Sequence, residues 1–336
     1  MTSAEELSGF ARSCLRVSES TQMGLQQLPV RGSDRSFFRV AWDNASSILI
    51  QYNEGREENN YYAEIADFLK SVGVPVPAVQ GHDPEKRLLL IEDLGSLDLF
   101  SFRKTGPGQL NTLYRNTLKE IHVLHTFPVQ DLPSTVRLME GFNETLYGWE
   151  HDYFKSHFVQ EMCGIALEGL RSEMLQRELS LLTERLMDTS ICLIHRDLQS
   201  QNVMIRDGKP CFIDFQGMRT GNRLYDIGSL LNDPYMMLSE DDILLLLRFY
   251  YELSDSNIAW NRFVDLFWEA SVQRLMQALG AYAFLSRNKG LISFLQHVPA
   301  GLAKLQTALA HTPRLQTLNG LVSECSVRAA TQHTQS

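Results

Sequence analysis

Three polar residues in one short stretch, Asp197, Asn202 and Asp214, have the types and the spacing that handle a metal ion and a proton. His195 and Asp197 lie two positions apart, and Asn202 follows Asp197 by five positions. Asp214 ends the short apolar run 211–213 further along the chain. Carboxylate and amide oxygens are the hard ligands that Mg²⁺ prefers, and these positions offer no thiolate and imidazole cluster of the kind that zinc favours. The stretch therefore predicts a magnesium site next to a proton-handling carboxylate.

Phosphoryl transfer needs this set of groups. The reaction requires little covalent chemistry, so the enzyme has to position the acceptor hydroxyl and neutralise phosphate charge through Mg²⁺. In the pattern H-x-D-x-x-x-x-N, the Asp contacts the acceptor hydroxyl and the Asn turns back toward the metal and the phosphates. Asp197 is therefore the predicted catalytic residue, and Asn202 and Asp214 are the predicted Mg²⁺ ligands.

Elements of the expected kinds surround these residues. Apolar runs predict strands over 191–194 and 203–205. A turn over 206–210 and a third strand that ends at Asp214 are expected to follow. A single H-x-D pair is more often a structural hydrogen bond than a catalytic pair. The joint pattern, completed by Asp226 at the start of a helix, favours a kinase catalytic loop over that alternative.

The composition is that of a folded enzyme without the charge that binds nucleic acid. With 336 residues, 44% of them hydrophobic and 21% charged, the chain can form two lobes around a sizeable core. A formal net charge of −9 argues against a nucleic-acid partner, because such a surface needs an excess of Lys and Arg. The five cysteines are scattered without a C-x-x-C pair, which favours a reducing compartment. No signal-peptide or membrane-span pattern is present, so a cytoplasmic protein without a membrane partner is expected.

The order of elements predicts an α+β, protein-kinase-like fold with two lobes. Residues 1–95 are interpreted as a small N-lobe on an antiparallel sheet that binds nucleotide, and residues 96–323 as a large, mostly helical C-lobe for catalysis and the acceptor. A polar tail over 324–336 is expected to be mobile. The N-lobe should contain a helix, a hairpin, a strand, a helix and a strand at 4–15, 28–40, 46–52, 57–72 and 87–91. The main C-lobe helices are expected at 110–127, 143–158, 171–187, 240–252 and 260–284.

The cleft between the lobes is the expected nucleotide site. The hairpin loop offers hydroxyls and backbone amides that could cover phosphate groups. These groups belong to Gly32, Ser33, Asp34 and Ser36. Because the loop has one glycine where the kinase loop has three, an ordinary hairpin turn is the alternative. Glu92 and Leu94 come at the end of the last small-lobe strand, where the linker would meet adenine.

One expected part of a kinase nucleotide site is missing. The third strand should carry a Lys that contacts the α- and β-phosphates, and Gln51 stands there instead. A neutral amide can hydrogen-bond phosphate but supplies no charge. Three alternatives follow: compensation by a nearby cation, a slow enzyme, or a protein that binds nucleotide without turnover. The candidate cations are Arg35, Arg39 and Arg56.

The chain as a whole resembles the aminoglycoside phosphotransferase and choline kinase superfamily of protein-kinase-like small-molecule kinases. The resemblance covers nearly the whole chain and rests on residues 32–40, 88–95, the catalytic block through 226–234, and 273–285. The last segment has the pattern Q-R-x-x-x-x-x-G-x-x-A-x-L. This pattern resembles that of the bacterial kinases that phosphorylate N-acetylmuramate and N-acetylglucosamine on the anomeric hydroxyl during cell-wall recycling.

The resemblance implies an ATP- and Mg²⁺-dependent transfer to the anomeric hydroxyl of an amino sugar. It also implies that Asp226 and His195 support the catalytic loop rather than take part in the reaction. The chain departs from the protein-kinase D-F-G pattern at Gln216. Two alternatives stay open: a kinase for another small hydroxylated acceptor, such as an aminoglycoside or choline, and a catalytically inactive nucleotide-binding protein.

The charge on the acceptor side of the cleft would separate the possible acceptors. A cationic acceptor requires an acidic or aromatic pocket, whereas N-acetylmuramate requires a cation. Glu150 could line a sugar site, but its helical pattern favours a solvated acidic face. Gln273 and Arg274 could reach an anionic group of the substrate, although such a pair more often has a structural role.

Overall fold

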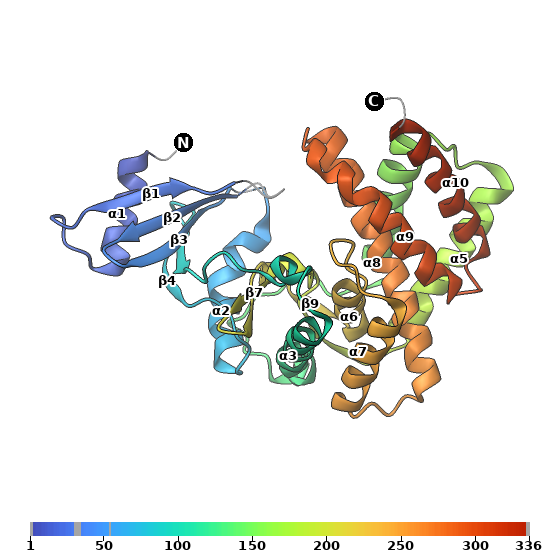
Figure 1. The fold of residues 1–336 in the computed structure, drawn as a ribbon, viewed down its shortest axis with the longest axis horizontal. Helices are drawn as coiled ribbons and strands as arrows, with labels where there is room; N and C mark the ends of the chain where they lie inside the picture. The colour runs from blue at the N-terminus through green and yellow to red at the C-terminus, as the bar shows by residue number, and fades with distance from the viewer. Residues whose placement is uncertain (1–2, 30–34, 54, 334–336) are drawn as a thin grey trace.

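In the computed structural model, the N-terminal part of the chain forms one five-stranded sheet (Figure 1). The structure describes residues 3–29, 35–53 and 55–333. All neighbouring strands of the sheet run antiparallel, as the sequence predicts. In spatial order the strands are β1 (Met23–Gln27), β2 (Ser36–Trp42), β3 (Ala45–Gln51), β5 (Leu88–Glu92) and β4 (Val79–Asp83).

Strand β5 is covered on both faces and so divides the core of this lobe. Leu88 and Leu90 pack in a small cluster with helix α1 (Ala4–Leu15), which lies over one face of the sheet. Leu89 and Ile91 belong to the main core of the molecule on the other face. Because successive side chains of a strand point to opposite faces, a strand buried on both faces needs a continuous apolar run.

The N-lobe differs from the predicted elements at two strands. The first strand of the hairpin lies at 23–27, before the predicted span of 28–40, because Pro29 cannot donate a ladder hydrogen bond. Strand β4 was not predicted, since Gln80, Gly81 and Asp83 are residues of low strand propensity. The predicted helix over 57–72 is present as a 3₁₀ turn, η1 (Glu57–Tyr61), followed by α2 (Tyr62–Ser71).

The C-terminal lobe is mostly helical, with two short two-stranded sheets on the side that faces the N-lobe (Figure 1). Strand β6 (Ile191–Ile194) pairs with β9 (Arg219–Asn222), and β7 (Val203–Arg206) pairs with β8 (Lys209–Phe212). The helices are α3 (Pro107–Thr126), α4 (Glu144–Tyr153), the π-helical η4 (Phe154–Met162), α5 (Gly169–Met187), α6 (Arg223–Leu231), α7 (Glu240–Leu253), α8 (Trp260–Asn288), α9 (Val298–Ala310) and α10 (Gln316–His333).

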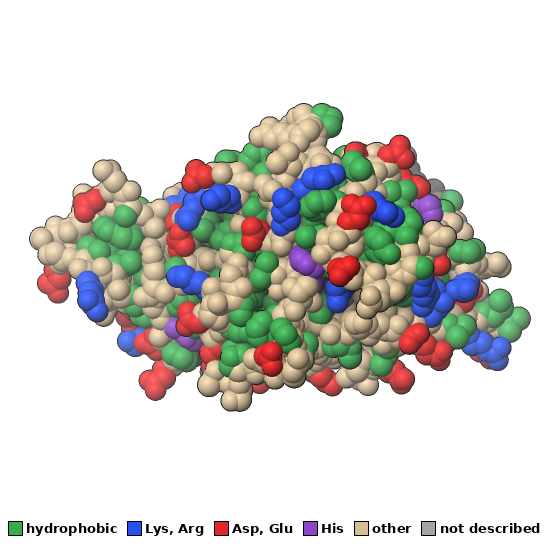
Figure 2. Space-filling model, turned by 90° about the horizontal axis from the view of Figure 1, so that it is seen from below, with side chains coloured by type: hydrophobic (Ala, Val, Ile, Leu, Met, Phe, Trp, Pro, Cys, Tyr) green, Lys and Arg blue, Asp and Glu red, His purple; other side chains and the backbone are tan. Residues whose placement is uncertain are grey.

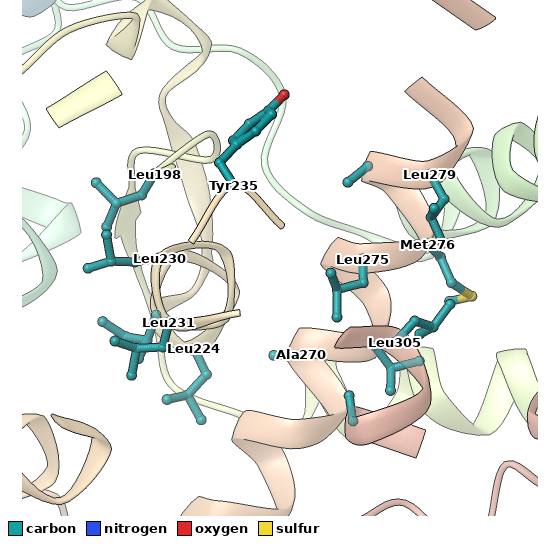
Figure 3. Close-up of a cluster of buried hydrophobic side chains, with 14 of the residues drawn as sticks. Leu198, Leu224, Leu230, Leu231, Tyr235, Ala270, Leu275, Met276, Leu279 and Leu305 are labelled. Atoms are coloured by element: carbon teal, nitrogen blue, oxygen red, sulfur yellow. The ribbon is translucent and has the colours of Figure 1, made fainter. Parts of the chain in front are cut away.

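Helix α8 runs through the centre of this lobe and packs against α6, α4 and α9. Figure 3 shows α6 next to α8, with Leu230 and Leu231 on the side of α6 that is turned away from Leu275 and Leu279 of α8. The crossing with α6 is close, because a Cβ atom at Gly228 would lie 2.9 Å from the Ser271 hydroxyl oxygen. Packing of α6 against α8 therefore fixes the position of the segments that enter and leave α6.

The C-terminal end differs from the predicted tail. The boundary expected at residue 324 falls inside α10, which continues to His333. Cys325 is fully buried, and Glu324 forms an ion pair with Arg171 of α5 at 2.9 Å. The reason is a helical spacing of apolar residues, Leu318, Leu321 and Cys325, which the polar composition of the last residues conceals.

The surface carries charges of both signs. Figure 2 shows acidic, basic and apolar side chains interspersed over one long face of the molecule. Across the part of the chain that the structure describes, no helix combines the length and apolar character that a membrane crossing requires.

Candidate active site

Asp226 of α6 binds the backbone of the loop that follows β6. One carboxylate oxygen of Asp226 accepts a hydrogen bond from the backbone N–H of His195 at 2.6 Å, and the other accepts one from Arg196 at 2.8 Å. His125 of α3 contacts the same fully buried carboxylate at 3.1 Å. Arg196 has a φ of 76°, so the chain turns sharply at this point. The buried carboxylate thus fixes the start of the loop.

His195 joins this loop to the segment that carries Asp214. Its Nε2 donates to the carbonyl oxygen of Ile213 at 3.0 Å, and its Nδ1 accepts from the backbone N–H of Asp197 at 3.3 Å. These two contacts require a ring that donates from Nε2 and accepts at Nδ1, which is one of the two neutral tautomers of histidine. His195 therefore links the backbone at Asp197 to the backbone at Ile213, just before Asp214.

Asp197 and Asn202 are brought together, as their spacing predicts. The amide nitrogen of Asn202 donates to the backbone oxygen of Asp197 at 2.9 Å and to its Oδ2 at 3.2 Å. Because that amide nitrogen faces Asp197, the amide oxygen of Asn202 is turned the other way. The Oδ1 atom of Asp197 accepts from the guanidinium of Arg274 at 2.5 Å.

Asp214 lies beside this pair in a strained backbone conformation. Its φ of 65° turns the chain directly after Ile213, whose N–H donates to the backbone oxygen of Asn202 at 3.0 Å. Gln216 donates to the Asp214 carboxylate at 2.8 Å, and Arg35 forms an ion pair with it. Burial acts to raise the pKa of Asp214, but the charge and hydrogen bond of Arg35 outweigh it and lower that pKa to about 2.

These donors fit a Mg²⁺ ion. The Asp214 carboxylate is ionised at neutral pH, and the Asn202 amide oxygen is not used for the contact with Asp197. Hard oxygen atoms of this kind suit Mg²⁺, which is bound through one or two protein ligands together with substrate phosphates and water. Asn202 and Asp214 are the residues that would hold it.

Four of the predicted nucleotide-binding residues have described positions, and they lie in two places. Gly32, Ser33 and Asp34 lie outside the described residues. Ser36 begins β2 and stands opposite Gln51 in the register of β2 and β3, so these two are neighbours at one end of the hairpin.

The remaining two predicted nucleotide-binding residues lie where the lobes meet. The Glu92 carboxylate pairs with Arg206 of β7 and accepts the N–H of Ala78 at 3.2 Å, which links the two lobes. Leu94 is buried directly after the end of β5.

The three arginines considered as substitutes for the missing lysine have different surroundings. Arg35 contacts Asp214. The Nε of Arg39 pairs with Asp93 at 2.7 Å, and Arg56 lies 3.9 Å from Glu58. Arg35 is therefore the one of the three that the described contacts bring to the predicted metal ligand.

The guanidinium of Arg196 lies close enough to those of Arg219 and Arg274 for their charges to interact. Arg274 contacts Asp197 and also donates to Ser229 at 3.0 Å and to Gln277. Arg219 of β9 is 9% exposed, and burial together with the charge of Arg196 lowers its pKa to about 10, so it stays charged at neutral pH. The Nε of Arg196 is buried and has no hydrogen-bond partner within the described part of the chain.

The sequence signalled this cluster only in part. The sequence offers Arg274 as a candidate partner for an anionic group and gives no such indication for Arg196 and Arg219, because the three residues come from a loop, a strand and a helix that only the fold brings together. Gln273 has the structural role expected of it, since it hydrogen-bonds His151 of α4 at 2.7 Å.

One expectation for this region was wrong. Glu150, expected on a solvated face, is 1% exposed and accepts hydrogen bonds from Tyr225 at 2.9 Å and Gln273 at 3.0 Å. The packing of α4 on α8 buries this face of the helix.

Comparison with known proteins identifies relatives over most of the chain. A family model described as the phosphotransferase enzyme family matches residues 24–266. An N-acetylmuramate/N-acetylglucosamine kinase of Pseudomonas aeruginosa is 25% identical over 299 residues, which cover 87% of this chain and 85% of that protein. A protein of the same name from Neisseria meningitidis is 24% identical over 299 residues, with 86% of this chain and 87% of that protein covered.

Solved structures with the same fold include two kinds of small-molecule kinase. A choline kinase of Cryptosporidium parvum has a TM-score of 0.64 at 13% identity, covering 95% of this chain and 98% of that one. An ADP-bound aminoglycoside phosphotransferase has a TM-score of 0.60 at 13% identity, covering 96% of this chain and 99% of that one. The likeness confirms the predicted two-lobed, kinase-like α+β fold.

Proposed function

Since the chain belongs to the phosphotransferase enzyme family and is a phosphotransferase with a hydroxyl acceptor, we propose that it transfers the γ-phosphate of ATP to the anomeric hydroxyl of N-acetylmuramate or N-acetylglucosamine. The relatives that carry this name are about 25% identical, so their acceptor is a proposal for this chain. The proposed location is the cytoplasm, where ATP and Mg²⁺ are available.

The proposed reaction assigns a task to each group of the site. Asp197 orients the acceptor hydroxyl and takes its proton, and Asn202 and Asp214 hold Mg²⁺. A bound Mg²⁺ would neutralise charge on the phosphates. His195 and Asp226 keep the two backbone segments in register through the hydrogen bonds described above.

The observation that carries the choice of acceptor is the cluster of Arg196, Arg219 and Arg274, of which Arg274 contacts Asp197. Guanidinium groups pair with carboxylates through charge-assisted hydrogen bonds, and the lactyl carboxylate of N-acetylmuramate is such a partner. A cationic aminoglycoside or choline would be repelled by the same groups. The buried acid of this region, Glu150, accepts hydrogen bonds from Tyr225 and Gln273, so it is already engaged within the protein.

The test is Mg²⁺·ATP turnover against N-acetylmuramate, N-acetylglucosamine, an aminoglycoside, choline and simple sugars. We expect turnover of the amino sugars, with N-acetylmuramate preferred, and its loss in Asp197→Asn. Asp207→Asn, in the exposed turn between β7 and β8, is the matched control and should keep full activity.

Two other results would contradict the proposed acceptor or the proposed activity. Turnover of choline or an aminoglycoside instead would move the acceptor and contradict the proposal. Nucleotide binding without turnover of any acceptor in the panel would favour the inactive nucleotide-binding alternative.

A further inference from the structure

We propose that Arg35 is the phosphate-binding cation of this enzyme, in place of the missing strand lysine, and that it moves between Asp214 and the nucleotide phosphates. The proposal rests on the proposed ATP-dependent phosphotransfer. It concerns a residue that the kinase pattern does not provide, because that pattern has its positive charge on the third strand.

The position of Arg35 supports the first part. Its side chain is 10% exposed, and its guanidinium reaches from the N-lobe hairpin to Asp214 in the C-lobe. It directly precedes Ser36, which stands opposite Gln51 in the sheet. The positively charged Arg35 therefore lies just before the start of β2, the strand that pairs with β3 next to the neutral Gln51.

The chemistry of the guanidinium suits this task. A guanidinium presents its N–H donors in a planar fork that can hold two phosphate oxygens at once, whereas an amide supplies no charge. Arg39 and Arg56 have carboxylate partners outside the metal site, Asp93 and Glu58.

The contact with Asp214 supports the second part. The carboxylate that Arg35 binds is also the predicted Mg²⁺ ligand, and a guanidinium and a divalent cation on one carboxylate repel each other. Metal binding therefore releases Arg35 from Asp214, and the phosphates that accompany the metal offer it a new partner. Arg35 competes with metal alone and assists the metal–nucleotide pair, so metal and nucleotide favour each other's binding.

The test is equilibrium binding, which needs no acceptor and no turnover. Free Mn²⁺ is followed by its electron paramagnetic resonance signal, first with protein alone and then with protein and ATP. In Arg35→Gln we expect Mn²⁺ alone to bind about tenfold more tightly and Mn²⁺·ATP about tenfold more weakly, as loss of one charge-assisted contact predicts. Arg35→Lys, which keeps the charge, should lie between the wild type and Arg35→Gln.

Arg137→Gln is the matched control, because it removes an Arg–carboxylate pair, with Glu64, that lies outside the site. It should change neither affinity. Weaker binding of Mn²⁺ alone in Arg35→Gln would mean that Arg35 merely supports Asp214, and an unchanged affinity for Mn²⁺·ATP would also overturn the proposal. A wild-type protein that binds no nucleotide would refute both the proposed function and this inference, whereas normal wild-type binding without the opposite shifts would refute the inference alone.

Discussion

Each of the two carboxylates proposed for catalysis and for metal binding has a guanidinium against it, and the two guanidiniums come from opposite lobes. Arg274 of α8 contacts Asp197, and Arg35 of the N-lobe contacts Asp214. The carboxylates were predictable, because a local motif fixes their spacing. Their cationic partners were not, because residues 77 and 179 positions away in sequence meet them only in the folded chain.

The guanidinium cluster makes a prediction about acceptor preference. Arg219→Gln should lower kcat/KM for N-acetylmuramate about tenfold or more. It should leave kcat/KM for N-acetylglucosamine nearly unchanged, because this sugar has no carboxylate that Arg219 could bind. The measurement is steady-state turnover of both sugars, with Arg248→Gln on the exposed side of α7 as control. Equal losses on both sugars would contradict a role in carboxylate recognition.

The carboxylate below the loop makes a prediction about stability. Asp226→Asn keeps the shape but turns an amide N–H₂ toward one of the two backbone N–H donors that the acid satisfies. We expect a loss of about 3 kcal/mol in the free energy of unfolding, measured in urea. Asp188→Asn, exposed just after α5, should cost little. A similarly small change in Asp226→Asn would show that the loop does not depend on this acid.

At the scale of elements, the packing of α6 against α8 determines where the catalytic loop and its supports lie. The long helices were predictable from the spacing of their apolar residues, and the helix predicted over 260–284 is present as α8 over Trp260–Asn288. Strand β4 and the close contact at Gly228 were not predictable, since neither has a local signal in the sequence. Burial of Glu150 was also not predictable, because it depends on which face of α4 meets α8.

The crossing of α6 and α8 can be tested with one methyl group. In Gly228→Ala the new Cβ would lie 2.9 Å from the Ser271 hydroxyl oxygen and 3.1 Å from its Cα, so α6 must shift. We expect a destabilisation of about 1–3 kcal/mol and a lower kcat, because α6 carries Asp226. The measurements are urea unfolding and turnover.

A second glycine serves as the control for this substitution. A Cβ at Gly320 in α10 would meet nothing within 4 Å, so Gly320→Ala should stabilise the protein by about 0.5–1 kcal/mol. If both substitutions had the same effect, the close approach of α6 and α8 would not be what limits position 228.

At the scale of the whole molecule, buried histidines make stability depend on pH. Burial lowers the pKa of His151 from its ordinary 6.5 to about 4. Burial also lowers the pKa of His125, which lies against Asp226 and Tyr250. The unfolded chain therefore binds more protons than the folded one between about pH 4 and 6.5, and stability rises with pH over that window.

The expected size of this effect can be stated for His151. Its share of the free energy of unfolding should fall by about 2 kcal/mol between pH 7 and pH 5. His151→Gln should remove that share, so its stability should depend less steeply on pH than that of the wild type, as urea unfolding at both pH values would show. His157→Gln is the control, because His157 follows six residues later on the same helical segment and is partly exposed. An unchanged slope in His151→Gln would contradict the assignment.

The division of the N-lobe core by β5 has a consequence for how the protein opens. The cluster under α1 is small and separate from the main core, so we expect α1 to detach without disturbing the main core. Such a unit opens at a lower free energy than the rest, and its amide hydrogens exchange with solvent first. When α1 detaches, Leu88 and Leu90 are uncovered on a bare sheet face, the kind of surface through which chains associate. Self-association under mild stress would then begin on the side of the molecule opposite α2, while the catalytic centre is still folded.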